Sequence, residues 1–138
     1  MVTFEGEFGE RAARRLRDEQ VVWLTTVGRD GTPQPSPVWF LWEDGAVLIY
    51  SQPNTPKVRN IARNGQVALS FNSDEHGGDV VILTGTAEAL DGGPQASGNA
   101  AYLAKYAGGL DSLKLTPEAF AAEYSMPIRV TPTKLRGF

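Results

Sequence analysis

The chain has 138 residues, no cysteine, a single histidine and a formal net charge of −3. Its length suits one domain, and charged residues (21%) interspersed with hydrophobic ones (41%) argue against disorder. The composition excludes disulfides and thiolate chemistry, and the acidic balance disfavours a nucleic-acid binder. Apolar runs are too short for a membrane span and the start lacks a signal-peptide pattern, so we predict one cytoplasmic domain over residues 1–138.

The first predicted element is a short helix with a basic face over residues 8–19. Six β-rich runs follow, over residues 20–27, 33–42, 46–51, 66–72, 79–88 and 128–131. Asp30-Gly31 and Asp44-Gly45 predict hairpin turns between the first three runs. Pro33, Pro35 and Pro37 alternate at the start of the second run, which predicts an edge position or a strand start, because proline cannot donate to a ladder.

Three more helices are predicted, over residues 57–64, 95–106 and 117–124. Thr55-Pro56 resembles an N-cap followed by proline at the first helical position, and Gly65 is the expected stop. Six short β-runs with few helices indicate an α+β protein built on an antiparallel barrel. Runs such as residues 80–83 are apolar on both faces, so the outer face needs a cover of helices or a second subunit.

The most informative stretch is residues 50–63. A strand ends in the hydroxyl of Ser51, a loop follows, and a capped helix opens with Lys57 in its first turn. A helix N-terminus offers free N–H groups and partial positive charge, and Arg59 and Arg63 add formal charge. This pattern favours a phosphate site, although a solvated basic helix face would give the same spacing.

The order of several motifs resembles one known family. Leu24-Thr25-Thr26-Val27, residues 30–40 (DGTPQPSPVWF), Tyr50-Ser51, Lys57-Val58-Arg59-Asn60 and Gly85-Thr86-Ala87 are together similar to the pyridoxamine 5'-phosphate oxidase-like superfamily, the flavin split barrels. Within it, the chain resembles the actinobacterial branch that depends on the deazaflavin coenzyme F-420. The resemblance runs from about residue 10 to residue 138.

This resemblance implies a six-stranded antiparallel split β-barrel of the FMN-binding type, working as a homodimer with the cofactor between the subunits. It implies a reductase that transfers hydride from reduced F-420 to a conjugated small molecule, with no catalytic side chain of its own. The alternatives are an FMN-binding oxidase or reductase and a non-catalytic cofactor-binding protein. By resemblance, the cofactor-binding residues are Ser51, Lys57, Arg59, Asn60, Trp39, Phe40, Tyr50 and Arg63; Trp39 and Phe40 could equally be barrel core.

Other residues depart from the family pattern or have simpler explanations. The chain ends without the Arg-Leu-x-Pro-type motif of true pyridoxamine-phosphate oxidases, so that substrate is not expected. Arg129, Lys134 and Arg136 are surface charges that could also contact the anionic tail of F-420. His76, beside Asp74 and Glu75, is interpreted as part of a polar loop rather than a metal site. Tyr102 and Tyr106 lie four apart in a predicted helix, which helix-surface packing explains.

Overall fold

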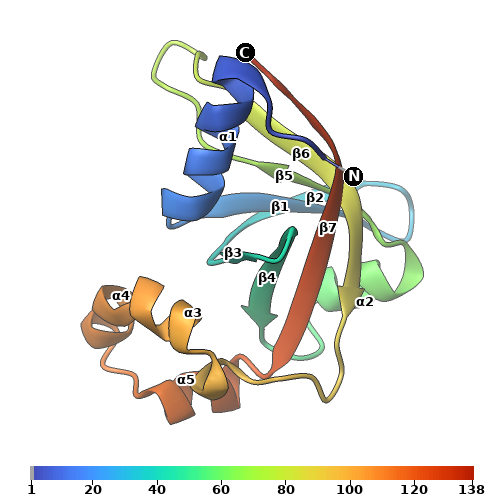
Figure 1. The fold of residues 1–138 in the computed structure, drawn as a ribbon. Coiled ribbons are helices and arrows are strands. Elements are labelled where there is room, and N and C mark those ends of the chain that lie inside the picture. Colours follow the sequence, from blue (N-terminus) through green and yellow to red (C-terminus); the bar gives the residue numbers. More distant parts are fainter. Residues whose placement is uncertain (1) are drawn as a thin grey trace.

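The strands form one antiparallel sheet that curls into an open barrel, as the computed structural model of residues 2–138 shows (Figure 1). The strand order is β2-β1-β5-β6-β7-β4-β3, so β2 and β3 are the two edges and the barrel is split between them. The α+β class and the antiparallel split barrel are thus confirmed. The strands are β1 (Val22–Val27), β2 (Pro33–Val38), β3 (Leu41–Glu43), β4 (Ala46–Ser51), β5 (Gln66–Ser70), β6 (Val81–Ala89) and β7 (Met126–Gly137).

The predicted count of six strands is wrong, because the second β-rich run is two strands. The run breaks at Trp39 and Phe40, between β2 and β3. The hydroxyl of Tyr106 accepts the Phe40 N–H at 2.8 Å and lies 2.9 Å from the Phe40 carbonyl oxygen. The Phe40 N–H is therefore satisfied by the Tyr106 side chain, and the Phe40 carbonyl also accepts from the ammonium group of Lys105 at 2.9 Å, so this backbone does not need a ladder partner.

The last strand is longer than predicted, because β7 pairs with both β6 and β4. The β6–β7 ladder shifts register between Thr84 and Gly85. A Cβ at Gly85 would lie only 2.2 Å from the carbonyl oxygen of Thr131, so this close approach requires glycine. β7 therefore joins β6 to β4 in the sheet, and the sheet is left open between its edges β2 and β3.

Both predicted hairpin turns are confirmed. Asp30-Gly31 lies in the turn between β1 and β2, and Asp44-Gly45 joins β3 to β4. Asp44 and Gly45 have φ values of +53° and +75°, as a two-residue type I′ turn requires. The prolines of β2 lie on an edge strand, also as predicted.

The helices agree with prediction in place but not in every boundary. They are α1 (Gly6–Asp18), α2 (Pro56–Arg63), the 3-10 turn η1 (Ala96–Gly98), α3 (Ala100–Lys105), α4 (Ala107–Ser112) and α5 (Pro117–Glu123). The predicted helix over 95–106 is divided, and α4 was not predicted. Gly65 does not act as a helix stop: its carbonyl accepts the Ala87 N–H at 2.7 Å, and a Cβ there would lie 2.9 Å from the Ala87 oxygen.

Two hydrophobic clusters form the core. One fills the barrel and includes Leu24, Phe40 and Leu83, with Leu16 from α1. The other joins β4 to α3, α4 and α5, which gather at one end of the molecule, away from α1 (Figure 1). Tyr102 and Tyr106 lie in this second cluster and are 0% and 1% exposed, so their interpretation as helix-surface residues is wrong.

None of the helices in residues 2–138 has the length and apolarity needed to span a bilayer.

Candidate functional site

A cavity of about 240 Å³ lies at the split of the barrel. Pro37 and Trp39, at the end of β2, line one side, and Tyr50 and Ser51, at the end of β4, line another. The helical cluster covers it with Tyr102, Leu113, Phe120 and Tyr124, and the start of α2 contributes Thr55 and Lys57. Two strand ends, a helix start and a helical cover therefore meet at one place.

One end of the cavity is rich in hydrogen-bond donors. Ser51 is 4% exposed, and its hydroxyl lies 2.8 Å from the Gln52 carbonyl oxygen and 3.3 Å from the hydroxyl of Thr55. Thr55 occupies the N-cap position of α2, but its side chain makes no capping hydrogen bond. The first-turn N–H groups of α2 are thus left uncapped by Thr55, in the geometry that binds anions.

Lys57 brings a positive charge to this donor-rich end. Its side chain is half-buried, and burial lowers the pKa of the ammonium group. Within residues 2–138, no carboxylate lies within ion-pair distance of Lys57. A partly buried cation without a protein counter-ion is costly, and a bound anion would offset that cost. The donors and the charge together suit a phosphate.

The other walls of the cavity are aromatic. Trp39 stacks on Tyr106, with ring centroids 4.5 Å apart and an interplanar angle of 5°, and lies 5.9 Å from the Phe120 ring. A Cβ at Gly109 would lie 2.8 Å from the Trp39 ring, so glycine allows α4 to approach it. Flat aromatic walls of this kind suit a planar ring system.

Tyr102 is a cavity residue that the sequence did not reveal. Its ring meets Tyr50 edge-on at 4.8 Å, and its hydroxyl is the one buried side-chain polar atom of residues 2–138 without a hydrogen-bond partner. Burial raises the pKa of the Tyr102 phenol, so the group stays protonated. The Tyr102–Tyr106 spacing was visible in the sequence, but only the folding of α3 against β4 shows what it contacts.

The structure brings four of the predicted site residues to the cavity: Trp39, Tyr50, Ser51 and Lys57. Phe40 does not line it. The Phe40 ring is 0% exposed in the barrel core, with the ammonium nitrogen of Lys105 3.7 Å from its centroid and 2.9 Å from its carbonyl oxygen. Of the two interpretations of Phe40, the structure favours core.

The three remaining predicted residues lie on α2 but not at the cavity. The guanidinium of Arg59 donates to the carbonyl of Asn54 and is otherwise exposed. Asn60 is buried, and its side-chain NH2 group donates to Thr26 and to Gln34, at 3.0 and 2.8 Å. Its side-chain oxygen Oδ1 accepts from Arg63 at 2.8 Å. Asn60 therefore fastens α2 to the β1–β2 hairpin, and a direct cofactor contact from these residues stays a prediction.

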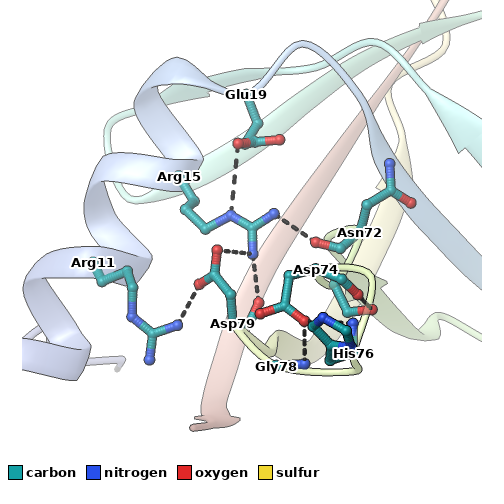
Figure 2. Close-up of polar contacts among 9 residues, drawn as sticks. Arg11, Arg15, Glu19, Asn72, Asp74, His76, Gly78 and Asp79 are labelled. Carbon is teal, nitrogen blue, oxygen red and sulfur yellow. Dashed lines mark hydrogen bonds and ion pairs between the residues drawn. The ribbon is translucent and has the colours of Figure 1, made fainter.

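The loop that carries His76 has a structural explanation. The Asp74 carboxylate accepts the backbone N–H groups of His76 and Gly78, at 2.9 and 2.7 Å, so it closes its own turn (Figure 2). Arg11 and Arg15 of α1 reach the next segment of this loop at Asp79 (Figure 2). In the part of the chain that the structure describes, no three His, Asp or Glu side chains gather as metal ligands.

The basic residues of β7 are exposed and lie outside the cavity. Arg129 pairs with Glu88 across the strands at 3.5 Å, whereas Lys134 and Arg136 lie beside Thr84 and Ile82 in the β6–β7 ladder. A contact between these residues and an anionic cofactor tail stays a prediction.

Comparison with known proteins identifies a family and several solved structures of similar fold. Residues 8–134 match the family model described as pyridoxamine 5'-phosphate oxidase. An F420 reductase is 27% identical over 89% of this chain and 94% of its own, with a TM-score of 0.66. A FAD-binding protein from Mesorhizobium loti is 18% identical over 91% and 90%, with a TM-score of 0.65.

A heme storage protein from Vibrio cholerae, HutZ, is 16% identical over 99% of this chain and 95% of its own, with a TM-score of 0.63. At such identities the last two show the fold alone. No protein among those with curated descriptions matches the sequence.

Proposed function

The chain belongs to the pyridoxamine 5'-phosphate oxidase family, and from this premise we propose that it is a reductase that uses coenzyme F-420 to transfer hydride to a conjugated organic acceptor. The observation that carries the proposal is a cavity in which the ammonium of Lys57, unpaired within residues 2–138, and the hydroxyls of Ser51 and Thr55 adjoin aromatic walls. A phosphate followed by a planar ring has this shape and chemistry. The likeness to an F420 reductase, at 27% identity, supports the choice of deazaflavin.

Each part of the site has a physical task in this proposal. Lys57 and the start of α2 hold the phosphate by charge and by N–H donation. Trp39 and Tyr50 orient the ring, and the helical cover with Phe120 excludes water from the reacting face. When bound, the deazaflavin supplies the hydride. The chain needs no nucleophile for such a reaction, in keeping with its lack of cysteine and with a single histidine that does not line the cavity.

FMN is the second candidate cofactor, because the same phosphate end and aromatic walls suit it and a fold neighbour binds FAD. With FMN, the protein would be an oxidase or flavin reductase. A protein that binds the cofactor without turnover would have the same cavity. The three cases differ in which cofactor binds and in whether an acceptor is reduced.

We also propose that two copies of the chain form a dimer. The outward side chains of the sheet include Trp23, which is 37% exposed, and Ile82, which lies in the same row across β5. Val27 and Ala68 extend this half-buried face. An obligate interface of this kind buries about 2,000 Å² or more, and a second copy would supply the cover.

Turnover tests the proposed function. Purified protein is mixed with reduced F-420 and a panel of electron-poor quinones, nitroaromatics and enones, and the return of the oxidised deazaflavin absorbance is followed. The proposal expects oxidation that depends on both protein and acceptor. Tight F-420 binding without turnover of any acceptor would favour the non-catalytic alternative.

A further inference from the structure

The open edge of β2 has an unusual hydrogen-bonding character. Pro33, Pro35 and Pro37 alternate along this strand. In an antiparallel pair, every second residue directs its N–H and C=O to the partner, and the residues between direct theirs away. Gly28 N–H donates to the Thr32 carbonyl at 2.8 Å, so the even-numbered residues of β2 bond to β1. The three prolines therefore occupy every position that faces the open edge.

An edge of this composition presents acceptors only. Each proline contributes a carbonyl but no N–H, whereas an ordinary strand edge alternates donors and acceptors. Such an edge discourages pairing with another strand, since half of the ladder hydrogen bonds cannot form. It also restricts which small molecule can bond to it: the molecule must donate.

This edge borders the cavity, and the facing wall differs from it. Pro37 lines the cavity on the β2 side, and Tyr50 lines it on the β4 side, beyond the end of β3. On β7 the residue opposite Tyr50 is Pro127, which has no N–H to give. Tyr50 thus belongs to a non-bonded pair with β7 and directs its own N–H and C=O toward the split. One wall offers acceptors alone, and the other offers a backbone donor as well.

We propose that the ligand of this cavity is recognised by an N–H donor that bonds to the backbone carbonyl of Pro37. This rests on the proposed function, because a deazaflavin carries an imide N–H between two carbonyls on the pyrimidine part of its ring. The acceptor-only edge selects heterocycles with such a donor. It selects against an iron porphyrin, the ligand class of a heme-storage neighbour, because an iron porphyrin has no N–H group.

The test compares a deazaflavin with its imide N-methyl derivative, titrated by fluorescence into three proteins. These are the wild type, Pro37→Ala and the matched control Pro33→Ala, whose proline lies on the same edge but does not line the cavity. Methylation removes the donor and leaves the Pro37 carbonyl unpaired, so we expect about tenfold weaker binding by wild type and by Pro33→Ala. Pro37→Ala keeps this carbonyl and adds an N–H that can donate to a ring carbonyl, so it should show the same tenfold loss on methylation but bind both ligands about three- to tenfold more tightly than wild type does, whereas Pro33→Ala should not.

The outcomes separate this inference from the proposed function. Tenfold losses on methylation in all three proteins, with tighter binding of both ligands by Pro37→Ala alone, support the recognition of the imide at this edge. Equal binding of the two ligands by wild type, or affinities that neither Pro37→Ala nor Pro33→Ala changes, overturns it and leaves the proposed function standing. No binding of the unmethylated deazaflavin to wild type refutes the proposed function, and this inference with it.

Discussion

Replacing Lys57 by methionine should weaken binding of a phosphate-bearing cofactor and leave the free protein intact. Methionine keeps an unbranched apolar stem along the cavity and removes only the charge. A charge-assisted hydrogen bond contributes roughly 1.5–3 kcal/mol, so the affinity for F-420 should fall about ten- to a hundredfold. Ser51 and the start of α2 remain, and binding should therefore weaken without being abolished.

The stability of the free protein should not fall with this substitution. Burial lowers the pKa of Lys57, and the structure shows no carboxylate partner for it, so its charge stabilises nothing in the unliganded state. The same shift predicts that wild-type affinity declines as pH rises through the lowered pKa, because the ammonium is lost. Lys57→Met should show no such decline.

Isothermal titration with F-420 and with a deazaflavin truncated before its phosphate provides the assay. Arg29→Met is the control: it removes an exposed cation in the turn between β1 and β2 that does not line the cavity, and should cost less than threefold. Lys57→Met should scarcely change the affinity for the truncated ligand, since the partner is already absent. Equal losses with both ligands would refute the reasoning, since Lys57 would then act through the ring or the fold.

Three further predictions concern the Tyr106 hydroxyl, the Lys105 ammonium and the oligomeric state. Tyr106→Phe removes the hydroxyl that accepts the Phe40 N–H, so it should lower the free energy of unfolding in urea by about 1–3 kcal/mol. The hydroxyl of Tyr124 makes no such bond, so Tyr124→Phe should change the free energy of unfolding little. Unchanged stability of Tyr106→Phe would show that the strand break has another cause. Burial lowers the pKa of Lys105 to about 8, so above that pH the folded state binds fewer protons than the unfolded state. Between pH 7 and 9.5 the free energy of unfolding of wild type should therefore rise relative to that of Lys105→Met, by about 1 kcal/mol or less after allowance for solvent screening. A loss over that range would mean that the Phe40 carbonyl and ring hold the ammonium charged. Light scattering at low micromolar concentration should give a dimer mass, and Trp23→Glu, on the outward face of the sheet, should shift it toward monomer; a wild-type monomer would contradict the proposed dimer.

The parts of the fold that depend on neighbouring residues were predictable from the sequence. Asp44-Gly45 specifies its own turn, because both residues tolerate positive φ. The alternating prolines of β2 identify an edge strand whatever the rest of the sheet does. Ser51 and Lys57 could be assigned to one site from the sequence, because a short loop joins the end of one strand to the start of the next helix.

The remaining features depend on contacts between distant segments. The strand break at Phe40 is set by Tyr106, and nothing within ten residues of Phe40 indicates it. Tyr102 and Phe120 reach the cavity only because α3 and α5 fold back against β4. Asn60 lies on the predicted helix, but its amide is used by the β1–β2 hairpin rather than by the cavity. Local patterns showed which residues could bind, and tertiary packing decided which of them share one cavity.

The proposed function depends on the identity of the cofactor, which competitive titration of the purified apoprotein determines. F-420 and FMN are each titrated by fluorescence, and each is then used to displace the other. We expect F-420 to bind more tightly than FMN and to displace it fully. Equal or tighter binding of FMN, or a yellow flavin that co-purifies in stoichiometric amount, would contradict the F-420 assignment and move the protein to the flavin-binding alternative.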